Sequence, residues 1–167
     1  MKKILIAMCV ALLSMSAQAQ EKGNFAVGLR GGATISKIKI EGLSINETST
    51  RFGIGVFGQY NLTNHWRLDL EGIYHPKKDG FSDFVVGLNV HYLFNIGEDV
   101  RIYPLLGYGL SFGSADGADT ETDGGIQLGA GIQYNFQSNL FLAGEYKYQP
   151  GLFGDGHVPM VSIGYRF

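Results

Sequence analysis

The chain consists of short segments in which apolar residues alternate with small or polar ones. In the final nine residues, one set of alternate positions holds Pro159, Val161, Ile163, Tyr165 and Phe167. The other set holds Met160, Ser162, Gly164 and Arg166. Since successive side chains of a β-strand point to opposite faces, this pattern predicts a strand with one apolar face.

Seven earlier segments repeat the alternation, and residues typical of turns separate them. They span residues 25–35, 52–60, 66–75, 84–94, 101–112, 126–136 and 140–148. We expect each to contribute about nine to eleven residues, the length that a tilted strand needs to cross the hydrocarbon layer. The sequence therefore predicts an all-β fold, an eight-stranded antiparallel up-and-down transmembrane β-barrel.

The charges distinguish a membrane barrel from a soluble one such as a lipocalin. One face of the predicted strands carries Arg30, Arg67, Asp69, Glu71, His91, Arg101, Glu145, Lys147 and Arg166, while the other carries almost no charge. A soluble barrel would have to bury these charges or else leave a large apolar surface in water. The pattern favours a barrel with its apolar face in lipid.

The predicted connections fall into two groups. Residues 61–65, 95–99 and 137–139 form tight turns, whereas residues 36–50, 76–82, 113–124 and 149–157 form longer or more polar loops. Short periplasmic turns and longer extracellular loops are typical of outer-membrane barrels. Aromatic residues such as Trp66, Tyr92 and Phe136 lie at the ends of the apolar faces, where rings prefer the membrane interface.

The amino terminus has the features of an export signal. Lys2 and Lys3 precede an apolar stretch at residues 4–13, and Ala17-Gln18-Ala19 follows as a cleavage site. The stretch is too short to span a bilayer as a helix. We predict a cleaved signal peptide at residues 1–19 and a barrel domain at 20–167. The single cysteine, Cys9, lies inside the predicted signal peptide, so we expect no disulfide in the mature domain.

The signal peptide, the eight segments and the ending Ile163-Gly164-Tyr165-Arg166-Phe167 resemble the small outer-membrane β-barrel proteins of OmpX, OmpA-barrel or PorT-like type. This resemblance implies a location in the outer membrane of a Gram-negative bacterium, in contact with its lipid. It also implies that Val161, Ile163, Tyr165 and Phe167 form the signal read by the barrel-insertion machinery.

The predicted inward face indicates how the lumen is filled. An eight-stranded barrel is just wide enough for side chains to fill its interior, where charges need partners. We predict a lumen ion-pair network of Arg30, Arg67, Asp69, Glu71, Arg101, Glu145, Lys147 and Arg166. The alternative is a narrow gated pore, because many inward positions are glycine and leave room.

Two further chemistries find weaker support. Asp119, Glu121, Asp123 and Gly124 match positions 1, 3, 5 and 6 of a calcium loop, but the twelfth position is Ala130 instead of Glu, which favours a solvated loop. A lipid-modifying enzyme would need His, Ser and an acid at the outer rim, for which His75, Ser82, Asp83 and His157 are candidates. No nucleophile motif surrounds any serine.

We therefore expect a monomeric outer-membrane protein with a structural or interaction role, without catalytic residues, metal or cofactor. A narrow channel for ions or small solutes is the second hypothesis, and a lipid-modifying enzyme is the third. The formal charge is −2 and the basic residues are scattered, so we expect no nucleic-acid partner.

Overall fold

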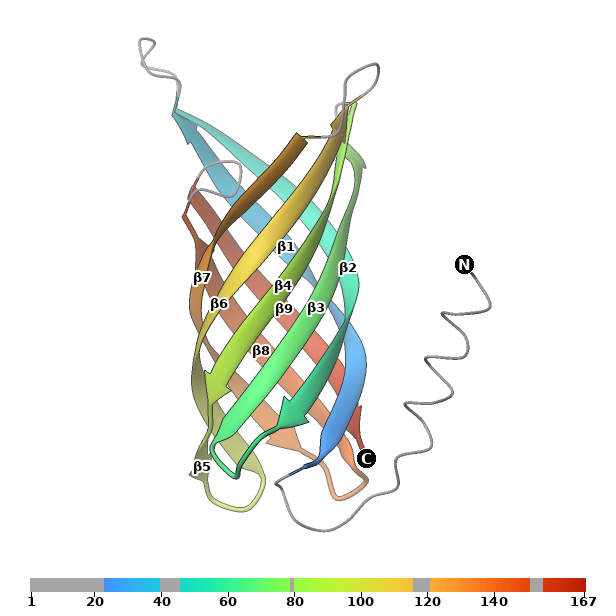
Figure 1. Ribbon diagram of the computed structural model, residues 1–167, viewed down its shortest axis with the longest axis vertical. Helices are drawn as coiled ribbons and strands as arrows, with labels where there is room; N and C mark the ends of the chain where they lie inside the picture. The colour runs from blue at the N-terminus through green and yellow to red at the C-terminus, as the bar shows by residue number, and fades with distance from the viewer. Residues whose placement is uncertain (1–22, 40–45, 79, 116–120, 151–154) are drawn as a thin grey trace, which may run out of the picture.

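The computed structural model describes residues 23–39, 46–78, 80–115, 121–150 and 155–167, which form one closed barrel (Figure 1). Its strands are β1 (Phe25–Lys39), β2 (Asn46–Asn61), β3 (Trp66–Lys78), β4 (Phe81–Tyr92), β5 (Phe94–Ile96), β6 (Val100–Ala115), β7 (Glu121–Asn135), β8 (Leu140–Gln149) and β9 (Asp155–Arg166). Residues 1–22, which include the predicted signal peptide, lie outside the described part. No helix in the described residues is long and apolar enough to cross a membrane.

The strands pair in antiparallel fashion in the order β4-β3-β2-β1-β9-β8-β7-β6-β5, so that the first long strand, β1, pairs with the last, β9, and the β4–β6 pairing completes the barrel. Strands β4 and β5 both pair with β6 and form one stave of the barrel. The eight staves confirm the predicted fold class. Closure leaves no strand edge unpaired, which is what the interior of a bilayer requires of a β-structure.

Two prolines interrupt the ladders. The β4–β6 pairing stops at His91 opposite Leu105 and resumes as β5 with Phe94 opposite Ile102, and Pro104 lies in the gap. The closing seam between β1 and β9 has a similar gap around Pro159. Proline has no N–H to donate to a neighbouring strand, which accounts for a break at each position.

The two faces of the barrel are those predicted. Large apolar side chains such as Leu70 (56 % exposed) and Val161 (60 % exposed) point outward into the lipid, while charged side chains point inward. The short turns and the end of β9 lie at the lower end of Figure 1, the periplasmic end. Ring contacts stabilise a girdle at this end, namely Trp66–Tyr92, Tyr92–Phe94, Tyr134–Phe136 and Tyr165–Phe167.

The strands are longer than predicted. They run to 16 residues in β2 and β6, and most of the expected 36–50 loop belongs to the β1–β2 ladder, which pairs as far as Lys39 opposite Asn46. The predictions for loops 76–82, 113–124 and 149–157 are wrong in the same direction. Outside the lipid the strands no longer need an apolar face, so the alternation ends although the backbone ladder continues.

The inward glycines face large inward side chains. A Cβ atom added to Gly28 would lie 2.5 Å from the ring of Phe57, and one added to Gly131 would lie 2.5 Å from the ring of Tyr103. Gly164 faces the ring of Phe141 in the same way. The space that these three glycines leave in the wall is occupied by aromatic rings.

This packing predicts that Gly131→Ala destabilises the barrel while Gly144→Ala does not. The added methyl group at Gly131 would overlap the Tyr103 ring, and overpacking of this kind costs about 1–3 kcal/mol. At Gly144, on the next strand, the nearest atom to an added Cβ lies 3.9 Å away. The free energy of unfolding in urea, measured in liposomes, checks the difference. Equal stability of the two variants would contradict this account of the lumen.

Candidate functional site

The centre of the lumen holds a buried ion-pair network around Arg30 of β1. Its guanidinium Nη2 lies 2.9 Å from Asp69 Oδ2, and its Nη1 contacts Glu71 and lies 3.5 Å from Glu145 Oε2. Lys147 of β8 contacts the other oxygen of Glu71. These side chains are at most 1 % exposed, so the pairs lie in a region screened from water. The structure thus brings five of the predicted network residues together.

Neutral polar side chains complete this layer, and the sequence analysis did not single them out. Gln59 Nε2 donates to Asp69 Oδ2 at 2.8 Å, and Tyr103 donates its hydroxyl to Glu145 Oε1 at 2.7 Å. Asn89 donates to Glu71 Oε1 at 3.3 Å. The sequence signal that could have identified these three side chains is their position on the inward face of the alternating pattern. We call these eight residues the central layer: Arg30, Gln59, Asp69, Glu71, Asn89, Tyr103, Glu145 and Lys147.

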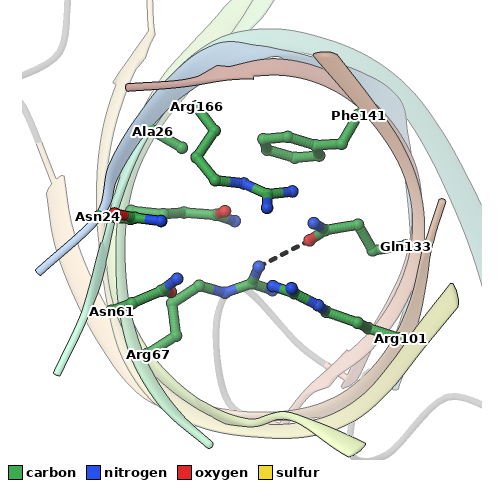
Figure 2. A pocket seen from close by; sticks show the side chains of 9 residues that line it. Asn24, Ala26, Asn61, Arg67, Arg101, Gln133, Phe141 and Arg166 are labelled. Carbon is green, nitrogen blue, oxygen red and sulfur yellow. Dashed lines mark hydrogen bonds between the residues drawn. The ribbon is translucent and has the colours of Figure 1, made fainter. Parts of the chain in front are cut away.

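The three remaining arginines of the predicted network lie between the central layer and the periplasmic end of the lumen. Figure 2 shows Arg67, Arg101 and Arg166 extending into the lumen, where they line a cavity of only about 10 Å³. Arg67 donates to Gln133 Oε1 at 2.6 Å and to His91 Nδ1 at 3.2 Å, and its guanidinium lies over the Tyr103 ring. Arg166 donates to Asn135.

Apolar side chains separate the polar layers. Ile73, Val85, Val158 and Met160 form one buried cluster, on the extracellular side of the central layer. Phe57 and Phe141 pack with Ala26 and Ala143 in a second cluster toward the periplasmic end. Along the axis the lumen is therefore a stack of polar and apolar layers.

A second polar cluster lies at the extracellular end, above the apolar cluster of Ile73 and Val85. Thr34 Oγ1 lies 3.0 Å from His75 Nε2, and Asp83 Oδ2 lies 2.8 Å from His75 Nδ1. Arg51 contacts the other oxygen of Asp83. These four residues come from β1, β3, β4 and β2, and they line a cavity of about 170 Å³ that we call the outer cavity.

A β-bulge shapes this cluster. The register of β3 and β4 shifts between His75 and Lys78, so that Pro76 and Lys77 together face one residue of β4. Arg51 Nη2 donates to the carbonyl oxygens of Pro76 and Phe81, at 3.4 and 3.1 Å. Bulges often re-aim side chains at the rims of barrels. Here the bulge accommodates a proline, and Arg51 holds its backbone.

The structure brings together only part of the enzyme candidate set. His75 and Asp83 are in contact, but Thr34 occupies the hydroxyl position where the sequence pointed to Ser82. His157 lies on the outer surface, 2.6 Å from the hydroxyl of the exposed Tyr146. The grouping of Ser82 and His157 with His75 is therefore wrong. His75 points into the lumen, whereas Ser82 and His157 lie on the outward faces of their strands.

The calcium-loop candidate also differs from its expected form. Glu121 and Asp123 belong to β7 and pair with Gly113 and Ser111, while Asp119 lies outside the described residues. Within the described ranges, no three His, Cys, Asp or Glu side chains are grouped so that they could hold a metal ion.

The predicted assembly residues lie on one outward face of β9. Val161, Ile163 and Tyr165 are 60, 50 and 41 % exposed. Phe167 donates its backbone N–H to the carbonyl of Phe25 at 2.8 Å, and the two rings stack. The face is continuous with the lipid-facing surface. Its recognition by insertion machinery stays a prediction.

Comparison with known proteins supports this architecture. The chain is 24 % identical over 177 residues to the attachment invasion locus protein of Yersinia pseudotuberculosis, covering 95 % of this chain and 92 % of that one. The barrel domain of Pseudomonas aeruginosa OprF superposes with a TM-score of 0.68 at 19 % identity, over 87 % of this chain and 98 % of that one. Yersinia pestis Ail superposes with a TM-score of 0.58 at 21 % identity, over 87 % and 99 %.

The family described as outer membrane protein beta-barrel domain matches residues 5–167. This match confirms the family resemblance and the outer-membrane location inferred from the sequence. With the closed barrel, its lipid-facing apolar surface and its filled lumen, it establishes that the chain belongs to the outer membrane protein beta-barrel domain family.

Proposed function

We propose that this protein is a closed, non-conducting outer-membrane barrel with a structural or interaction role and no catalytic activity. The observation that carries the proposal is the central layer, in which Arg30 and Lys147 pair with Asp69, Glu71 and Glu145 and their side chains fill the lumen. The cavity beneath it has a volume of about 10 Å³, enough for one water molecule. A hydrated ion has no continuous path through this packing.

The extracellular rim supports an interaction role. Strands β1 and β2 stay paired as far as Lys39 opposite Asn46, and in Figure 1 they extend further at this end than β8 and β9. The name of the Yersinia pseudotuberculosis relative refers to attachment and invasion. We infer that contacts with a partner are made at this rim, since the outer wall faces lipid.

In the part of the chain that the structure describes, the extracellular cluster lacks groups that hydrolysis would need. Thr34, His75 and Asp83 are in the contact order of a hydroxyl–imidazole–carboxylate triad. Acyl transfer also needs donors directed at a developing oxyanion. Arg51 is engaged by Asp83 and by the carbonyls of Pro76 and Phe81, and the residues around it belong to paired strands. This arrangement supports a binding surface over a catalytic centre.

The sealed lumen predicts that the purified protein adds no stepwise current to a planar lipid bilayer over a range of voltages. The recordings use about 1 M salt, at which surface charges are screened. A general porin measured in the same bilayers provides the positive control. Reproducible unitary steps from the folded protein would favour the narrow-channel hypothesis and overturn this proposal.

The central layer predicts a strong coupling between Lys147 and Glu71. Lys147→Met alone should destabilise the barrel by about 3–5 kcal/mol, the usual cost of breaking a buried ion pair, because it removes one of the two cations that contact the Glu71 carboxylate. Adding Glu71→Gln should recover part of the loss. Lys78→Met is the control, since Lys78 is exposed and, among the described residues, donates to the Thr50 carbonyl. Additive effects of the two lumen substitutions in urea unfolding would be inconsistent with the contact.

A further inference from the structure

We infer that the outer cavity binds a small neutral polyhydroxylated ligand, a single sugar unit of the hexose type, from the extracellular side. This inference rests on the proposed interaction role and supplies a ligand class for it. It is independent of the central layer, because the apolar cluster of Ile73, Val85, Val158 and Met160 lies between the two.

The size of the outer cavity limits its occupant. At about 170 Å³ it is far larger than the cavity of about 10 Å³ at the periplasmic end. It is smaller than the roughly 300 Å³ at which pockets for drug-sized ligands begin. A single ring with its substituents matches this space, while a longer chain could place only its terminal unit inside.

The charges lining the cavity favour a neutral ligand. Arg51 and Asp83 form an ion pair in its wall, so a guanidinium and a carboxylate lie side by side with their charges cancelled. An anion would meet Asp83, and a cation would meet Arg51. A hydroxyl group both donates and accepts, so neighbouring hydroxyls of a sugar can donate to the carboxylate and accept from the guanidinium. Thr34, Ser36, Ser49 and Gln149 add further neutral donors and acceptors.

Two buried polar atoms in the cavity wall lack a partner. Among the described side chains, Ser111 Oγ and Arg51 Nε have no hydrogen-bond partner although both are buried. Ser111 is fully buried, and both residues line the outer cavity. Buried polar groups in folded proteins nearly always have a partner, and each exception needs a reason. Because almost no surface of either atom is open to a water molecule, a polar occupant would complete these contacts after a rotation of the Ser111 or Arg51 side chain.

The remaining wall is apolar and rigid. Phe81 and Val85 supply carbon surface, against which the C–H face of a sugar ring can pack. Small-molecule sites typically combine apolar surface of this kind with polar groups that orient the ligand. The Arg51 contacts to Asp83, Pro76 and Phe81 hold the bulge in place before any ligand arrives, which lowers the entropy that binding costs.

Saturation-transfer NMR on the folded full barrel tests the inference. The probes are the methyl glycosides of glucose, galactose and mannose, and inorganic phosphate, followed by the broadening of its phosphorus NMR signal, is the charged comparison. The detergent must carry no sugar headgroup, because an alkyl maltoside would compete for the site. We expect saturable binding of at least one glycoside and none of phosphate.

Two variants locate the binding. Ser36→Phe places a ring in the outer cavity without removing any ion pair, and we expect it to weaken glycoside binding by about tenfold or more, a change of about 1.4 kcal/mol. Ser114→Phe puts the same ring on an exposed position of β6 near the same rim and should leave the affinity within about twofold. Heat-modifiable gel migration verifies that both variants are folded. Asp83→Asn, if it folds, should also weaken binding by about tenfold, since hydrogen bonds to a charged group are strong.

Three results would overturn the inference: no saturable binding of any glycoside, binding of phosphate in their place, or unchanged binding in folded Ser36→Phe. None of these bears on the bilayer conductance of the barrel, so the proposed sealed lumen would stand or fall separately. If a glycoside binds, repeating the measurement in bilayers with and without lipopolysaccharide identifies the source. Suppression by lipopolysaccharide indicates a membrane glycolipid, and an undiminished signal indicates a free glycan.

Discussion

The pairing of β1 with β9 is the contact on which the rest of the structure depends. In lipid, a strand edge without a partner leaves backbone N–H and C=O groups unsatisfied, so a sheet must close. Closure at eight staves then fixes the width of the lumen, and side chains must fill it. Because this width is fixed, a large ring on one strand requires a glycine opposite it. Phe57 faces Gly28 and Tyr103 faces Gly131, where a larger residue would have no room.

The central layer joins staves that are not neighbours in the sheet. Arg30 of β1 contacts residues of β3 and β8, and Lys147 of β8 contacts Glu71 of β3 across the lumen. Replacing buried ion pairs with apolar side chains is often neutral for stability, so their presence is weak evidence of a large stabilising effect. Contacts across the lumen instead depend on the relative register of distant strands, and a slip of one residue would turn each charge toward lipid.

The fold could be predicted from the sequence because lipid enforces the alternation. Leu70 and Val161 must be apolar and Asp69 and Ser162 must point inward, so the period of two is unbroken wherever the strand is in the membrane. Beyond the lipid this constraint ends, so the alternation does not indicate the extension of β1 and β2 to Lys39 and Asn46. The alternating pattern identifies which charged side chains point into the lumen, but it does not identify which of them contact one another. Thr34 and His75 are 41 positions apart, and their contact depends on strand tilt and on the bulge at Pro76.

The closing seam also has a consequence for the kinetics of assembly. It joins the first strand to the last, so this contact has the greatest sequence separation in the domain, and such contacts form slowly. The gap at Pro159 leaves fewer bonds to secure the seam once the two strands meet. The barrel therefore cannot close until β9 is available. Until then the edge of β1 has no partner strand and needs protection from aggregation.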